Sequence, residues 1–252
     1  ERIFERAGLA IAQSTLGEWV GVCGVVYEFA DSRACEHART FLGKWRGKLV
    51  CDDYSAYKAG FELGITEIGC MAHARRKFFE LHANHKSQIA EQALKYFGTL
   101  YDVERDVAEL KPEHRREVRQ ERARPIADAL HAWMTGQRKR VSEGSAIAKA
   151  LDYSLKRWEA LTRYLVDGHV PVDNNWLENQ IRPWATGRSN WLFAGSLRAG
   201  KRAAAIMSLI RSAQLNGHDP YAYLKDVLER LPTHRADDIA ALLPHRWAPV
   251  AA

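Results

Sequence analysis

The spacing of apolar residues predicts alternating strands and helices in the first third of the chain. Between residues 22 and 83, three short strand-like runs, "VCGVVYEF", "KLVCDDY" and "ITEIGCM", alternate with two helical patterns, "SRACEHARTFLGKW" and "AHARRKFFELH". This alternation is typical of an α/β domain. Residues 1–20 read instead as two short helices, with a capping box formed by Thr15 and Glu18. Both a DNA-reading helix-turn-helix and an ordinary helical hairpin fit that pattern.

The remainder of the chain reads as mainly helical. Residues 84–168 repeat apolar positions at helical spacing, and one face of the first helix carries Phe97, Leu100 and Tyr101. A turn then leads to a helix around Glu178, a strand or extended segment "NWLFAG", and two helices at 198–215 and 220–231. We therefore divide the chain into four zones, which are 1–20, 21–83, 84–168 and 169–252.

Composition narrows the class of protein only slightly. The 252 residues carry 37 Lys and Arg against 31 Asp and Glu, a net charge of +6, which favours an anionic partner. Four Cys without a C-x-x-C spacing indicate reduced thiols in a cytosolic protein. No apolar run is long enough to cross a membrane, and the first residues do not form a signal peptide. Because the sequence does not begin with Met, we expect it to start inside a longer protein.

The candidate metal ligands are acidic residues at the end of a predicted strand and on the predicted helix around Glu178. Asp52 and Asp53 end the run "KLVCDDY", and α/β sheets carry reactive groups at that end of a strand. Mg²⁺ binds through one or two carboxylates plus phosphate oxygens, so Asp52 and Glu178 would form a site if the helix packed beside the strand. Two such ions about 4 Å apart would clamp a phosphodiester. The residues alone favour the plainer alternative, a strand end and a surface acid.

Two other polar patterns have competing interpretations. Cys70-x-x-His73 with His82-x-x-His85 imitates a zinc set. One predicted helix would spread these side chains over about 18 Å, so we expect no zinc and place His73 near the strand end. The basic cluster "HRREVRQERAR" contains interspersed Glu, which favours a solvated helix face over a track for phosphates.

Four segments resemble the transposase of the insertion sequence 66 family: "LVCDDYSAYKAGF", "GCMAHARRKFFELH", "DNNWLENQIRPWATGRSNWLFAGS" and "GKRAAAIMSLIRSAQLNGHDPYAYLKDVLERLP". They follow the family's order over nearly all of residues 25–245. The resemblance implies an α/β fold, namely a ribonuclease H-like catalytic core interrupted by a large all-helical insertion at 84–168 and followed by C-terminal helices. It also implies DNA cleavage and strand transfer by an Asp, Asp, Glu triad with two Mg²⁺ or Mn²⁺ ions. By motif position, the second Asp is Asp52 and the Glu is Glu178.

The resemblance makes double-stranded DNA the expected partner, at the element's terminal repeats and at the target. Asn174 and Asn175 would cap the Glu178 helix and leave N–H groups for phosphate. Basic side chains at the start of the helix after Cys70 oppose the helix dipole, which a phosphate contact explains better than stability does. The expected DNA-binding residues are Arg75, Arg76, Lys77, Asn174, Asn175, Arg182 and Arg188.

One departure from the family pattern affects the expected activity. Only "GVCG", residues 21–24, separates the first helices from the first strand-like run, where the family places two strands and its first catalytic Asp. Asp31 lies at the wrong motif position, and Glu28 is the only stand-in. We therefore expect an internally deleted, N-terminally truncated and incomplete core that is catalytically defective. The alternative is a non-enzymatic DNA-binding remnant that acts on element ends. Either form would act in the bacterial cytoplasm at the nucleoid, as a homo-oligomer or with an intact transposase.

Overall fold

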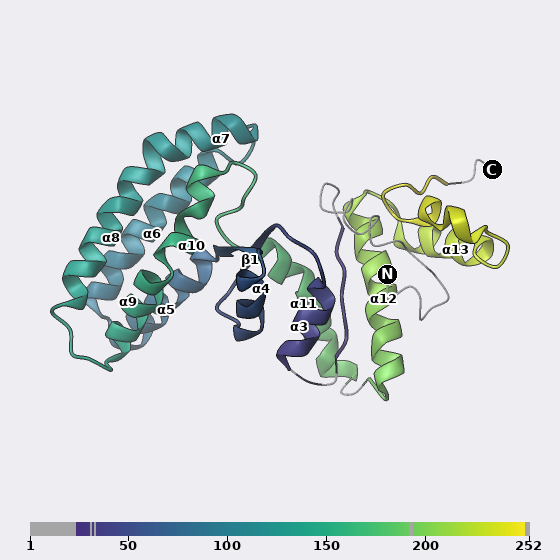
Figure 1. Ribbon diagram of the computed structural model, residues 1–252, viewed down its shortest axis with the longest axis horizontal. Helices are drawn as coiled ribbons and strands as arrows, with labels where there is room; N and C mark the ends of the chain where they lie inside the picture. Colours follow the sequence, from purple (N-terminus) through teal and green to yellow (C-terminus); the bar gives the residue numbers. More distant parts are fainter. Residues whose placement is uncertain (1–23, 31, 33, 192–193, 250–252) are drawn as a thin grey trace. The chain divides into compact units, whose positions relative to one another are not determined.

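The computed structural model describes residues 24–30, 32, 34–191 and 194–249, and it contains two compact units (Figure 1). One unit is Arg46–Glu178, and the other combines the described parts of Glu1–Trp45 and Asn179–Ala252. The expected helix-turn-helix at 1–20 lies outside the described residues, as does Asp31. No helix in the described part is both long and apolar enough to span a membrane.

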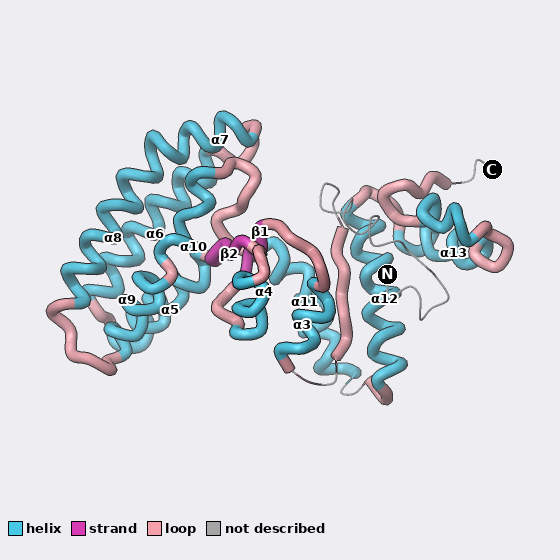
Figure 2. The backbone as a smooth tube through the Cα atoms, viewed as in Figure 1, coloured by secondary structure: helices cyan, strands magenta, loops and turns pink. Residues whose placement is uncertain are grey.

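A small parallel sheet forms the start of the unit Arg46–Glu178 (Figure 2). Strand β1 (Lys48–Cys51) pairs with β2 (Thr66–Gly69) in a register that sets Cys51 opposite Gly69. The short helices η2 (Ser55–Tyr57) and α4 (Lys58–Glu62) connect them. Both strands were expected from sequence. The described residues thus form a mixed α/β fold with two strands, and most of the chain is helical.

Helices make up the rest of this unit. They are α5 (Met71–His85), α6 (Gln88–Asp106), α7 (Pro112–Val118), a π-helical turn (Arg119–Ala123), α8 (Arg124–Arg138), α9 (Ala146–Lys156), α10 (Trp158–Thr162) and η4 (Arg163–Val166). The hydroxyls of Ser87 and Ser145 cap α6 and α9 by accepting backbone N–H groups. Phe97 and Leu100 are fully buried in the main core, which confirms the apolar face expected on α6.

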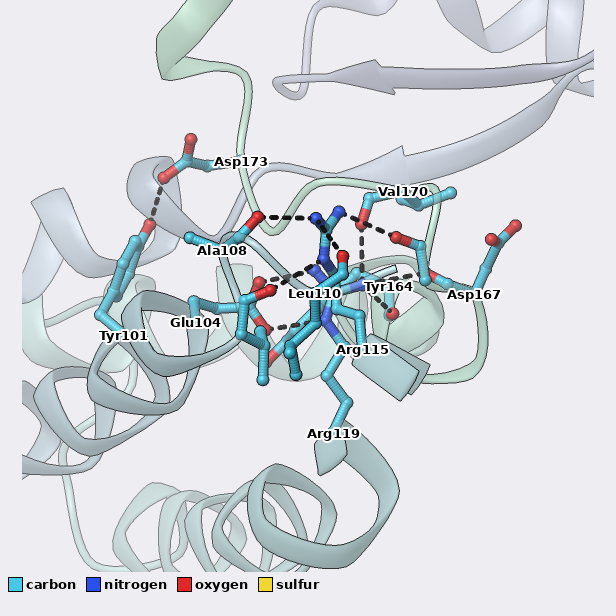
Figure 3. Close-up of polar contacts among 12 residues, drawn as sticks. Tyr101, Glu104, Ala108, Leu110, Arg115, Arg119, Tyr164, Asp167, Val170 and Asp173 are labelled. Carbon is cyan, nitrogen blue, oxygen red and sulfur yellow. Dashed lines mark hydrogen bonds and ion pairs between the residues drawn. The ribbon is translucent and has the colours of Figure 1, made fainter. Parts of the chain in front are cut away.

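Two arginines of the basic cluster bind the protein's own backbone (Figure 3). Arg119 is only 1% exposed and donates to both carboxylate oxygens of Glu104, at 2.8 and 2.6 Å. The same guanidinium donates to three carbonyls, those of Tyr164, Asp167 and Val170. Arg115 donates to four more, those of Val107, Ala108, Leu110 and Gly168. These two residues therefore fasten the chain that leaves the helical region, and neither serves a phosphate track.

The second unit is also helical. It contains α3 (Cys35–Leu42), most of α11 (Asn175–Trp191), α12 (Leu197–Leu215), α13 (Pro220–Arg230) and η5 (Ala236–Leu242). A short turn joins α12 to α13, and Gly217 in it adopts a φ of 78°, which glycine tolerates without strain. Tyr223, Val227 and Trp247 form the centre of a small core. The two helices expected at 198–215 and 220–231 are confirmed.

Two expectations for this unit are wrong. The strand expected at 22–29 is absent, because described residues 24–30 are extended but pair with no strand. The N–H of Val25 donates instead to the Ser212 hydroxyl at 3.0 Å, and that of Tyr27 to the Ser208 hydroxyl at 2.8 Å. Serine hydroxyls on α12 thus satisfy backbone groups that a neighbouring strand would otherwise satisfy. The segment "NWLFAG" is not extended at its start either, because α11 continues to Trp191.

Candidate functional site

The site begins at the carboxyl ends of the two parallel strands. Asp52 follows β1 and Cys70 follows β2, so both lie at one edge of the sheet. The Cys70 N–H donates to the Cys51 carbonyl at 3.1 Å and extends the pairing by one residue. Cys70 is also the residue from which α5 starts.

Cys70 fixes the chain that returns from the helical region. Its thiol donates to Asn174 Oδ1 at 2.9 Å, while the Asn174 N–H points at the sulfur at 3.5 Å. One residue on, the Met71 N–H donates to the Val172 carbonyl at 3.1 Å. The Glu178 N–H then donates to the Asn174 carbonyl at 3.0 Å as α11 begins. This relay of hydrogen bonds links the end of β1, next to Asp52, to the first turn of the Glu178 helix.

Glu178 lies beside two basic side chains of α5. Its Oε1 is 3.4 Å from His73 Nε2, and its Oε2 is 3.7 Å from Arg76 Nη2. Residues three apart share a helix face, so His73 and Arg76 present both nitrogens toward the same carboxylate. The Glu178 side chain is 37% exposed, which leaves the carboxylate accessible to a ligand. The other ring nitrogen of His73, Nδ1, is buried and has no hydrogen-bond partner in the described part of the molecule.

Asp173 holds the start of α11, a role that the sequence assigned to the two asparagines. Its Oδ1 accepts the Asn175 N–H at 3.0 Å, and its Oδ2 accepts the Tyr101 hydroxyl at 2.6 Å (Figure 3). Burial, reinforced by the hydrogen bond to Asp173, raises the pKa of Tyr101, so this hydroxyl stays a donor. Asn174 is occupied with Cys70. An Asp whose side chain accepts the backbone N–H two residues later is a recognisable turn signal before a helix start, and it was missed here.

The two acids after β1 have different surroundings. Asp53 Oδ1 lies 2.8 Å from Arg157 Nη1 and 3.7 Å from Lys58 Nζ, so its charge is neutralised locally. Arg157 is 9% exposed and also pairs with Glu67 on β2. Asp52 forms no ion pair with a described residue. Its Oδ1 accepts the Tyr54 N–H at 3.1 Å, and its carbonyl accepts from Arg157 at 3.3 Å. Arg157 therefore fixes this loop and leaves the Asp52 carboxylate half-buried and uncompensated.

The expected DNA-binding residues of α5 separate on the helix. Arg75 is exposed, with its guanidinium 5.8 Å from the ring centre of Phe79, which is 50% exposed. Arg76 is exposed beside Glu178. Lys77 instead packs its ammonium 4.4 Å above the Tyr153 ring on α9.

Two further expected contacts belong to α11. Arg182 is exposed and lies in the part of α11 assigned to the second unit. The side chain of Arg188 lies outside the described residues.

The donor set suits a hard cation better than zinc. Asp52 and Glu178 offer carboxylate oxygens, the ligands that Mg²⁺ and Mn²⁺ prefer. Two groups of the zinc alternative have other partners, the Cys70 thiol with Asn174 and His73 Nε2 with Glu178. No set of three or more His, Cys, Asp or Glu that could hold a metal gathers among the described residues. Two carboxylates would therefore need phosphate, water or a further acid to complete a site.

The relay cysteines are expected to resist alkylation. Burial raises the pKa of Cys51 to about 12 and also raises that of Cys70, so both thiols stay protonated at pH 8, whereas Cys35 is exposed. Iodoacetamide at pH 8 should therefore label Cys35 in the folded chain, and label Cys51 and Cys70 only in urea. Peptide mass spectrometry measures this. Labelling of Cys70 at the rate of Cys35 would contradict the buried relay.

Known proteins match the chain over most of its length. The model of the transposase IS66 family covers residues 23–202, and that of the IS66 C-terminal element covers residues 208–245. Three uncharacterized proteins of Sinorhizobium fredii are similar: y4hP is 38% identical over 239 residues, y4jD 34% over 232 and y4qI 36% over 234. The alignments cover 88%, 88% and 89% of this chain but 43%, 45% and 43% of those proteins. The chain thus spans less than half the length of these relatives. No solved structure matches.

Proposed function

Because the chain belongs to the IS66 family of transposases, we propose that it forms part of the machinery that cuts and joins DNA at the ends of an insertion sequence. In this proposal the sheet and the first turn of α11 belong to a ribonuclease H-like core. The helices of 84–168 are its insertion, and 169–252 contains the second part of the core and the C-terminal helices. The substrate is the phosphodiester backbone of double-stranded DNA. The complete reaction is proposed for the longer protein, since the relatives are more than twice as long as the matched region.

The hydrogen-bond relay from Cys51 through Cys70 and Asn174 to Glu178 is the observation that carries this proposal. It ties the strand end that bears Asp52 to the helix turn that bears Glu178. The contrast between neighbouring acids supports the choice of Asp52, because Arg157 and Lys58 neutralise Asp53. An uncompensated, half-buried carboxylate at a strand end is suited to bind a cation.

The side chains of the site would divide the work as follows. Asp52 and Glu178 would hold Mg²⁺ or Mn²⁺, which when bound neutralises charge on a phosphodiester and lowers the pKa of water. His73 and Arg76 orient the Glu178 carboxylate, and Asn174 fixes the backbone of its helix turn. Arg75 projects from the exposed side of α5, where a guanidinium can bind a phosphate through two donors. Substituting each of these residues tests the role assigned to it.

We further propose that this chain alone does not cut DNA. The family uses three acids, whereas this sequence supplies Asp52 and Glu178 and has only Glu28 near the expected place of the first. A supercoiled plasmid incubated with the full chain and Mg²⁺ or Mn²⁺ should therefore show no more nicking than with Glu178→Gln. Gel electrophoresis over a time course measures this. Nicking by the unchanged chain that Glu178→Gln abolishes would show that a complete site assembles without the first Asp.

A second candidate function is DNA binding without cleavage. It is favoured by the pairing of Glu178 with His73 and Arg76, and by the lack of a three-ligand metal set in the described part of the chain. Such a protein would occupy element ends or associate with an intact transposase. Duplex binding that is equally tight in EDTA and in Mg²⁺, in a chain that binds no metal, would favour this function over the catalytic one.

A further inference from the structure

The sequence that follows Glu178 has an unusual distribution of charge. Between Glu178 and Asp219 there is no acidic residue, although the whole chain has 31 acids in 252 residues and a stretch of this length would hold about five. The same stretch contains six basic residues, which are Arg182, Arg188, Arg198, Lys201, Arg202 and Arg211. Segregation of this kind produces a positive potential that neighbouring side chains do not cancel.

The structure shows the difference in pairing. In the helical region, basic side chains find carboxylates: Arg119 pairs with Glu104, Arg122 with Asp106 and Arg138 with Asp152. From 179 to 218, no described basic side chain forms an ion pair with a carboxylate in the described part of the chain. The partners of Arg211 are neutral, since its guanidinium donates to the side-chain oxygens of Gln180 and Gln214 at 2.8 and 2.6 Å.

Helix α12 directs part of this charge into solvent. One face of the helix is covered by the extended segment 24–30, which bonds to Ser208 and Ser212 (Figure 1). Gly200 lies on that face, and a Cβ there would approach the ring of Phe29 to 2.4 Å. Residues two positions from Gly200 point the opposite way on a helix.

The residues two positions before and after Gly200 are Arg198 and Arg202, and both are exposed. Lys201 lies between these two arginines in sequence, is displaced to one side of them on the helix surface, and is partly exposed. Local stability does not account for this placement. Basic residues in the first turns of a helix oppose its dipole, and like charges four residues apart repel. The expected compensation is an external anion with several charges.

We propose that Arg198, Lys201 and Arg202 form a phosphate-binding row, and that its partner is the backbone of duplex DNA. Arg198 and Arg202 are separated by about 6 Å along the helix axis, so two planar guanidinium groups can bind phosphates of one strand. This inference rests on the proposed function, because it names a second DNA contact beyond α5 and α11. It does not depend on the assignment of Asp52 and Glu178.

Salt-dependent binding to a 30-bp duplex, measured by fluorescence anisotropy in EDTA with the full chain, tests the row. Each phosphate contact contributes about 0.9 to the slope of log affinity against log salt. Arg198→Ala with Arg202→Ala should therefore flatten the slope by about two units and weaken binding at least roughly tenfold at 0.1 M salt. The matched control is Arg235→Ala, an exposed arginine in the same unit that is paired with Asp237. It should leave the slope unchanged.

One further variant and the use of EDTA separate the possible results. Arg198→Lys with Arg202→Lys keeps the charge and should restore most of the slope, and circular dichroism checks that all variants fold. Because binding is measured in EDTA, a flattened slope in the Arg variants supports the row even if the catalytic assignment of Asp52 and Glu178 fails. Equal slopes for Arg198→Ala/Arg202→Ala and Arg235→Ala would overturn the row. A chain with no salt-dependent affinity for duplex DNA would overturn both the row and the proposed function.

Discussion

Replacement of Arg119 by Met is expected to lower the free energy of unfolding by about 3–5 kcal/mol, because it leaves a buried carboxylate without its partner. Glu104 is only 12% exposed and receives two hydrogen bonds from Arg119. The same substitution removes the donor from three backbone carbonyls, two of them in fully buried hydrogen bonds. Urea unfolding followed by circular dichroism measures the loss.

A neighbouring ion pair provides the control. Arg122 lies in the same π-helical turn and pairs with Asp106 at 2.6 Å, but both side chains are about half exposed. Solvent screens such a pair, so Arg122→Met should cost less than about 1 kcal/mol. Combining Arg119→Met with Glu104→Met should cost less than the sum of the two single changes, because the buried charges disappear together. Equal losses for Arg119→Met and Arg122→Met would show that the buried network does not stabilise the unit.

The buried network also bears on the candidate site. Arg119 binds the carbonyls of Asp167 and Val170, which lie in the segment that leads to Asp173 and α11. Tyr101 of α6 then binds Asp173 itself. The helical region therefore fixes the chain from which Glu178 starts, and α5 supplies the two basic partners of that carboxylate. We infer that the helices of this unit position the site as well as stabilise it.

Local patterns in the sequence were sufficient for the elements around the site. Strands β1 and β2 were recognised from short apolar runs, and helices α5 and α6 from the helical spacing of their apolar residues. Both signals involve only residues that are close in sequence, and all four elements are confirmed. The place of Asp52 at a strand end follows from the same pattern. The start of α11 was also placed correctly, because polar residues that can cap a helix cluster there.

Contacts between distant residues decided the rest. The apolar run at 22–29 reads as a strand, but a strand needs a neighbour, and serines of α12 take that place. Arg119 belongs to a basic cluster whose sequence resembles a solvated face, and only the fold brings Glu104 and three carbonyls to it. The partners of Asp173 and Asp53, Tyr101 and Arg157, lie far away in sequence.

The central claim is that Asp52 and Glu178 share one metal site. Loss of residues that only support a metal ligand typically weakens binding by about 10–100-fold, and loss of a ligand costs more. Asp52→Asn and Glu178→Gln should each therefore weaken Mn²⁺ binding by more than roughly tenfold. Asp53→Asn is the matched control, because it changes the adjacent acid, which is already neutralised by Arg157 and Lys58.

Calorimetric titration of Mn²⁺ into the full chain and these three variants tests the claim most directly. We expect the unchanged chain and Asp53→Asn to bind Mn²⁺ with affinities within about twofold of each other, while Asp52→Asn and Glu178→Gln lose binding by similar factors. Mn²⁺ affinity that is unaffected by either substitution, or that depends on Asp53 rather than Asp52, would contradict a shared site at these two residues.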